Sequence, residues 1–286
     1  MKIGLNLYVW TTELTRDFYH VLPEVKRLGY DGIEVPVGTQ DERAYRDISS
    51  RLTDAGLQCT SITNVGADAN PASPDAKVRA RGLDRLRRAV DMSYVLESDN
   101  LVGPYFAAFG VFTGTGPTSD ELKWSADVMR EVAIHAQQAR LTLSIEWLNR
   151  FEIYLLNTTA QTRAFVDSVG QSNIGILYDT HHAHHEENDV RSAIVKDGGP
   201  TITHVHFSEN QRGTLGSGLV AWRETVEALR QIGYDATDRW IMAEAFNKDV
   251  PGLAAAAHVW RNCFESPSGF TEHSISFIKQ LWGYDG

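Results

Sequence analysis

Four apolar segments in the second half of the chain end in residues that can bind a metal ion or move a proton. The segments at 141–147, 173–179, 201–207 and 239–245 carry, near their ends, Glu146, Asp179, the pair His204 and His206, and Glu244. If the segments are parallel strands of a barrel, these side chains converge at the barrel mouth. Carboxylates buried side by side without a cation are costly, so we predict a metal site there.

The donor types narrow the choice of ion. Three carboxylates and one imidazole, with no cysteine near them, favour Mn²⁺, Mg²⁺ or Co²⁺ over a structural zinc site. His204 and His206 are two residues apart, and we expect only one of them to enter the barrel. The strand pattern does not choose between them. Taken singly, each acid has an ordinary alternative role as a helix cap or an ion-pair partner.

The elements that must position these residues alternate along the whole chain. Eight apolar or β-branched segments are each followed by a stretch of helical period, at 2–8, 31–37, 57–63, 100–106, 141–147, 173–179, 201–207 and 239–245. This alternation predicts an α/β fold, a single (β/α)8 TIM barrel that occupies residues 1–286 as one domain. An open doubly wound sheet is disfavoured, because the glycine-rich stretch at 110–116 contains none of the phosphate-binding motifs and is interpreted as a loop.

Two helix starts have recognisable capping sequences. Ser73, Pro74 and Asp75 predict a helix start at which Ser73 is the cap. Thr118 and Glu121 have the spacing of a capping box.

Composition excludes several classes of partner. The 286 residues have a net charge of −10, which disfavours nucleic acid and anionic membranes. No apolar run approaches the roughly 18 residues of a membrane span. Cys59 and Cys263 are far apart, and the first residues do not have the pattern of a secretion signal, so we expect a cytoplasmic protein.

Several segments resemble one known group of enzymes. IEWLNRFE (145–152), YDTHHAHHEE (178–187), HVHFSENQR (204–212) and MAEAF (242–246) are similar to the ketohexose 3-epimerases that act on tagatose and allulose (psicose). GLNLYVWTTE near the start is also similar to that group. The group belongs to the xylose-isomerase-like barrels, and the resemblance extends over nearly the whole chain.

The resemblance implies a role for each matching residue. It implies that one divalent ion per subunit, most simply Mn²⁺, is held by Glu146, Asp179, His206 and Glu244. It implies that Glu146 and Glu244 are also the catalytic acid and base. Glu152, His182 and Arg212 would bind the first two oxygens of the sugar, and we expect Phe246 to line the sugar pocket. Members of the group form dimers or tetramers, which implies a homo-oligomer.

The implied chemistry is an inversion at C3 of a free ketohexose. Removing a proton from one face of the carbon and returning one to the other requires two carboxylates, and a divalent ion next to the carbonyl stabilises the enediolate between the two steps. The closest alternative is an isomerase or epimerase of another small sugar, a sugar phosphate or a hydroxy acid. A DNA-repair endonuclease would need a basic face, and a non-catalytic sugar-binding barrel would not need two carboxylates beside one ion.

The histidine-rich stretch YDTHHAHHEEN (178–188) is interpreted as a strand end followed by a loop. Asp179 is its proposed metal ligand and His182 its proposed sugar contact. We expect His181, His184 and His185 to be loop packing or solvated groups. Glu186 and Glu187 would occupy the first turn of the next helix, where acidic side chains suit the helix dipole.

Overall fold

Eight parallel strands close into a barrel in a computed structural model that describes residues 1–283. Each strand pairs with its neighbours in chain order, and β8 pairs with β1. The strands are β1 (Lys2–Asn6), β2 (Gly32–Pro36), β3 (Gln58–Ile62), β4 (Asn100–Gly103), β5 (Thr142–Glu146), β6 (Ile174–Asp179), β7 (Ile202–Ser208) and β8 (Trp240–Glu244). The predicted fold class is confirmed. That 1–286 form one domain stays a prediction, and residues 284–286 lie outside the described part.

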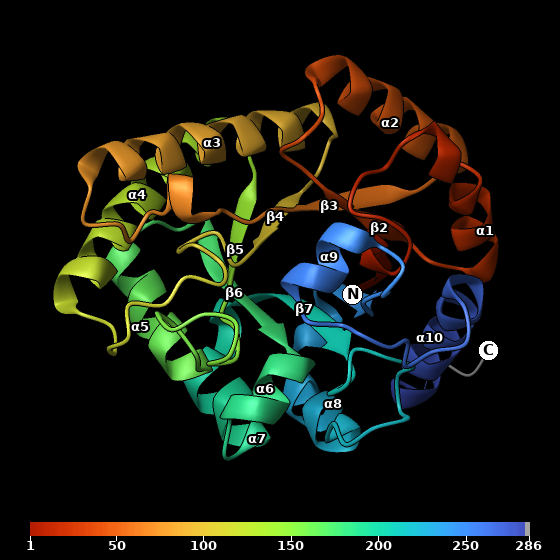
Figure 1. Cartoon of the computed structure of the whole chain (residues 1–286). Coiled ribbons are helices and arrows are strands. Elements are labelled where there is room, and N and C mark those ends of the chain that lie inside the picture. Colours follow the sequence, from red (N-terminus) through yellow and green to blue (C-terminus); the bar gives the residue numbers. More distant parts are fainter. Residues whose placement is uncertain (284–286) are drawn as a thin grey trace.

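The strands are surrounded by helices, most of them on the outside of the barrel and one, Pro251–Ala256, beside the cavity at its mouth (Figure 1). They are α1 (Val21–Leu28), α2 (Glu42–Ala55), α3 (Ala76–Val95), α4 (Ser119–Gln138), α5 (Thr159–Val169), α6 (Thr180–Glu186), α7 (Val190–Ser192), α8 (Trp222–Gln231), α9 (Pro251–Ala256) and α10 (Pro267–Leu281). Within residues 1–283, none of these helices combines the length and the apolar character needed to cross a membrane.

All eight predicted strand segments contain a strand, and the fourth strand is the shortest. The prediction extended to residue 106, but β4 ends at Gly103. Gly103 has a φ of 128°, and a Cβ at this position would come within 2.2 Å of the carbonyl oxygen of Thr63. Only glycine permits this backbone conformation and this close approach, so the chain turns out of the sheet there.

The two predicted helix starts had different outcomes. The capping box of α4 is confirmed, because the Thr118 hydroxyl accepts from the Glu121 amide and Glu121 accepts in return. The assignment of Ser73 as a cap was wrong. Asp75 caps α3 by accepting from the backbone amide of Lys77, while Ser73, two residues before Asp75, accepts from the amide of Asp75. Asp75 directly precedes the first helical residue, so its carboxylate lies closer to the free amides of the first turn than the Ser73 hydroxyl does.

The main core lies between the helices and the outer face of the barrel. A separate small cluster consists of Ile62, Val102 and Leu177, with Tyr8 packed against it. These residues come from β3, β4 and β6 and from the turn after β1. Of these residues, Tyr8 and Ile62 line the cavity described below.

Candidate active site

Three of the four strands that follow α4 have an acidic last residue. Glu146 is the last residue of β5, Asp179 of β6 and Glu244 of β8, and all three are buried. His206 lies in β7 at the level of Asp179. Its Nδ1 is 3.4 Å from Glu244 Oε1, 3.8 Å from Glu146 Oε1 and 3.9 Å from Asp179 Oδ2. The structure therefore brings the four predicted ligands to one point at the mouth of the barrel.

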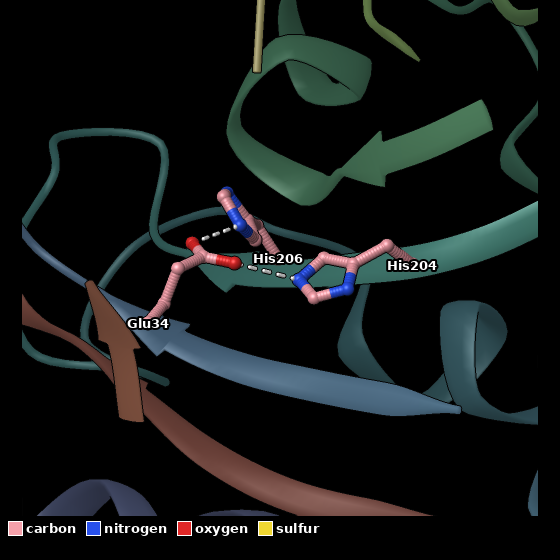
Figure 2. A group of neighbouring side chains, drawn as sticks. All are labelled: Glu34, His204 and His206. Atoms are coloured by element: carbon pink, nitrogen blue, oxygen red, sulfur yellow. Dashed lines mark ion pairs between the residues drawn. The ribbon is translucent and has the colours of Figure 1, made fainter. Parts of the chain in front are cut away.

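The expectation that only one of His204 and His206 enters the barrel was wrong. Side chains two residues apart on a strand point to the same face, and both imidazoles are fully buried inside. Their Nε2 atoms lie 3.0 and 2.8 Å from the two oxygens of Glu34 on β2 (Figure 2). Only His206 extends as far as the carboxylates of the mouth.

Burial affects the three mouth carboxylates differently. It raises the pKa of Glu146 well above its ordinary value, and His206 offsets this only in part. Burial also raises the pKa of Asp179, although the positive charge of Arg212 reduces this increase. At Glu244 burial again raises the pKa, but the nearby positive charges of Arg212 and His206 bring it below its ordinary value. The cluster thus carries more buried acid than its cations neutralise, which favours binding of a further cation.

The residues at the mouth fit a divalent ion. One ligand atom each from Glu146, Asp179 and His206 lies within 4.8 Å of the others. In the described part of the chain, His206 Nδ1 is buried and has no hydrogen-bond partner. A buried imidazole nitrogen that faces carboxylate oxygens without a partner is the geometry expected of a metal ligand.

Arg212 enters this cluster from the loop after β7. Its Nη1 donates to Asp179 Oδ2 at 3.0 Å and to Ser208 Oγ at 2.9 Å, and it forms a shorter contact with Glu244 Oε2. Its guanidinium also lies 4.2 Å from the ring centre of Phe246. Arg212 is thus buried and fixed between acidic and aromatic partners.

His182 projects into the same space from α6. The backbone amide of Asn149 donates to its Nδ1 at 3.0 Å. Burial and the charge of Arg212 hold the pKa of His182 well below its ordinary value, so the ring is neutral. Its Nε2 lies 3.6 Å from Glu146 Oε1 and 3.0 Å from the Arg212 Nη2 donor. His182 and Arg212 therefore contact each other at the wall of the cavity.

Glu152 lies on the outer side of His182. The side-chain amide of Asn149 donates to Glu152 Oε1 at 2.9 Å, and His181 Nε2 is 3.9 Å away. Burial raises the pKa of Glu152, but His181 and Arg212 outweigh this and lower it. Glu152 is therefore an ionised acceptor at neutral pH.

One cavity connects these side chains. Its lining includes six of the predicted site residues, namely Glu146, Glu152, His182, Arg212, Glu244 and Phe246, while Asp179 and His206 lie behind them. Tyr8 and Phe246 contribute an edge-to-face aromatic pair with ring centres 5.6 Å apart. The structure thus groups all eight predicted residues, and their roles remain a prediction.

The histidine-rich segment is a helix and not a loop. Residues 180–186 form α6, whose N-cap Asp179 accepts from the amides of His181 and His182. The placement of Glu186 and Glu187 in a helical first turn was wrong, because they are the last residue and the C-cap of α6. Glu186 instead pairs with Arg150 of the preceding loop, at 2.7 Å.

His181 is more than packing. It is buried, its ring contacts His182 edge-on, and it lies beside Glu152. His184 and His185 lie farther along the helix. His185 Nδ1 contacts the carbonyl oxygen of His181 at 2.7 Å.

The sequence reasoning missed Glu34 and Asn6. Both are polar residues within strands whose other residues are largely buried and apolar. A charged residue in such a strand was a usable signal, because a buried carboxylate needs partners.

A closed barrel with acids and an imidazole at the carboxyl ends of its strands defines a class of barrel enzyme. The chain belongs to the xylose isomerase-like TIM barrel family, whose sequence model matches residues 22–279.

Relatives within that family share nearly the full length of the chain. An L-ribulose 3-epimerase of Mesorhizobium japonicum is 31% identical over 97% of this chain and 93% of that protein. A ketose 3-epimerase of Arthrobacter globiformis is 29% identical over 98% of this chain and 96% of that protein. A crystal structure of a D-allulose 3-epimerase from Methylomonas sp. in complex with D-allulose superposes with a TM-score of 0.91 at 26% identity, and covers 98% of this chain and 97% of that one. The chain is accordingly an isomerase of the epimerase type.

Proposed function

We propose that this protein is a metal-dependent epimerase that inverts C3 of a free ketohexose, of the fructose/allulose or tagatose/sorbose type. The observation that carries the proposal is the pair Glu146 and Glu244, which line one buried cavity from β5 and β8 with His206 Nδ1 between them. A sugar epimerase is supported by the relatives named for 3-epimerisation of ribulose and other ketoses.

Inversion at C3 assigns complementary tasks to the two glutamates. One must accept the C3 proton on one face of the sugar while the other donates a proton to the opposite face. In the reverse reaction the two exchange roles. Glu146 and Glu244 come from strands separated by β6 and β7, so a sugar bound between them would present opposite faces to the two carboxylates.

Asp179, His206, Glu146 and Glu244 would hold the ion. Their oxygen and nitrogen donors suit Mn²⁺ first, with Mg²⁺ or Co²⁺ as alternatives. When bound, the ion supplies Lewis-acid stabilisation of the negative charge that develops when the proton leaves C3.

The remaining cavity residues would orient the sugar. His182 Nε2 and Arg212 Nη2 lie 3.0 Å apart and both side chains line the cavity, so a sugar oxygen there could hydrogen-bond to either of them. Glu152 could accept from a sugar hydroxyl, since its lowered pKa keeps it ionised. Phe246 and Tyr8 would pack against the apolar C–H face of the ring or chain.

The proposal also includes a homo-oligomer, a dimer or tetramer, in the cytoplasm. The resemblance to the 3-epimerase group supports the assembly. The free thiols of Cys59 and Cys263 agree with a reducing compartment.

The test is to incubate the Mn²⁺-loaded protein in deuterated water with fructose, allulose, tagatose, sorbose and ribulose. We expect deuterium at C3 of one epimer pair. Deuterium at C1 alone would indicate an aldose–ketose isomerase and contradict the proposal. Glu244→Gln should abolish exchange while sugar binding is retained. Glu121→Gln, the same change at a buried carboxylate of α4 outside the cavity lining, is the matched control and should exchange at the wild-type rate.

A further inference from the structure

We infer that Glu34 is a positioning residue for the metal site, because it places the proton of His206 on Nε2 and leaves Nδ1 to bind the ion. The inference deepens the proposed function and rests on the ligand set proposed there. Glu34 lies on β2, behind the proposed ligands, and does not itself line the cavity.

Four donor groups surround the Glu34 carboxylate, which is fully buried. Oε1 accepts from Asn6 Nδ2 at 2.8 Å and lies 2.8 Å from His206 Nε2. Oε2 accepts from Thr60 Oγ1 at 2.8 Å and lies 3.0 Å from His204 Nε2 (Figure 2). A carboxylate has about four acceptor sites, so each is already used. Glu34 is therefore not a further metal ligand, despite the cluster it forms with the two histidines.

Strand register explains why these groups meet. Asn6, Glu34 and Thr60 are paired residues of β1, β2 and β3, so they lie at one level of the barrel. Closure of the barrel brings this level across the interior to β7, which carries both histidines. The contact between Glu34 and His206 thus depends on the whole closed sheet.

The proton of His206 follows from this contact. An unprotonated Nε2 would place a lone pair 2.8 Å from a carboxylate oxygen, which is repulsive, whereas an N–H there is attracted to the negative charge. The N–H does not point straight at the oxygen, so the contact is electrostatic rather than a linear hydrogen bond. When Nδ1 gives up its proton to bind an ion, the imidazole is neutral and its one remaining N–H is the one on Nε2, beside Glu34.

Nδ1 is the nitrogen that faces the proposed ligands. It lies 3.4 to 3.9 Å from oxygens of Glu244, Glu146 and Asp179. Glu34 also reaches this group by a second route, since Asn6 Nδ2 lies 3.3 Å from Glu244 Oε1. A carboxylate behind a histidine ligand raises its basicity and fixes its orientation.

The experiment measures Mn²⁺ affinity of the EDTA-stripped full-length protein by calorimetric titration. Glu34→Gln preserves the size of the side chain but replaces one carboxylate oxygen with an NH₂ group. The two donor groups that face that oxygen would then face another donor. We expect Mn²⁺ binding to weaken about 10- to 100-fold. Glu121→Gln is the matched control and should bind Mn²⁺ with wild-type affinity.

A second measurement detects the proton itself. In ¹⁵N-histidine-labelled protein loaded with Zn²⁺, the wild type should show a protonated Nε2 on His206, and Glu34→Gln should lose or shift that signal. If Glu34→Gln does not fold, Glu34→Asp retains the charge but retracts it by one methylene, and should also weaken Mn²⁺ binding.

The outcomes separate the inference from the proposed function. Wild-type affinity in both Glu34 variants, with the Nε2 signal unchanged, would overturn the positioning role and leave the metal site intact. A wild-type protein that binds none of Mn²⁺, Mg²⁺ and Co²⁺ would overturn the metal site, and the inference with it.

Discussion

Arg212 offers a direct test of how the buried carboxylates are balanced. Its guanidinium pairs with Asp179 and Glu244, and its side chain is 6% exposed. Arg212→Met keeps the length and the packing over Phe246 but removes the charge. Removing one partner of a buried ion pair costs about 3–5 kcal/mol, because the remaining charge stays buried and unpaired.

The size of the chain converts this cost into a temperature. With about 2.1 cal/mol/K of unfolding entropy per residue, 286 residues give about 600 cal/mol/K, so each kcal/mol lowers the Tm by about 1.7 °C. Arg212→Met should therefore lower the Tm of the EDTA-stripped protein by roughly 5–8 °C. Saturating Mn²⁺ should reduce that difference to less than half, because the ion neutralises the same carboxylates.

Differential scanning calorimetry of wild type and variant, with and without Mn²⁺, measures both quantities. The matched control is Arg230→Met. Arg230 also lies over an aromatic ring, that of Trp282 at 5.2 Å, but it donates to a backbone carbonyl. The decrease in Tm caused by Arg230→Met should be small and should not depend on Mn²⁺. A Tm of Arg212→Met equal to wild type, or a deficit that Mn²⁺ does not change, would refute the reasoning.

Two further predictions concern the histidine helix and α4. His182→Ala should lower kcat/KM for the ketose about 100-fold, the usual cost of a positioned hydrogen-bonding group in an active site, whereas His185→Ala should stay within about twofold. Equal losses in the two variants would contradict the assignment of His182 to the sugar. Burial raises the pKa of Glu121, but hydrogen bonds from Tyr154 and the helix cap lower it overall. A lowered pKa stabilises the fold only while the carboxyl is ionised. Urea unfolding should therefore show wild type about 1 kcal/mol more stable than Glu121→Gln at pH 7, with the advantage lost as the pH falls below about 4. A difference that does not depend on pH would contradict this.

The strand pattern was sufficient to predict the barrel and the acids of its mouth. Each strand combines a short apolar segment with a following helical period, and both are local properties of the sequence. Glu146, Asp179 and Glu244 could be found because each is the charged end of such a segment.

The features that the sequence did not predict are of two kinds. Some are contacts between residues far apart in the chain, and others are segments whose local sequence suits more than one structure. Glu34 contacts His206 only because the sheet closes, which places β2 opposite β7. Histidine has only a moderate helix propensity and makes up four of the seven residues of α6, so the start of this helix depended on the Asp179 cap. The error at His204 was one of strand geometry, since alternate residues share a face.

The two sides of the barrel mouth differ in how freely they can change. The β5–β8 side carries the proposed ligands, whose three carboxylates lie 3.4 to 3.9 Å from His206 Nδ1. The opposite wall of the cavity comes from Tyr8, Ile62, Asn64 and Leu253, on the turn after β1, the end of β3 and α9. Substitutions on that wall alter the shape presented to the far end of a sugar and leave the reacting groups in place. Under the proposed function, directed evolution for a different ketose has its natural targets on that wall, away from the two glutamates assigned to proton transfer.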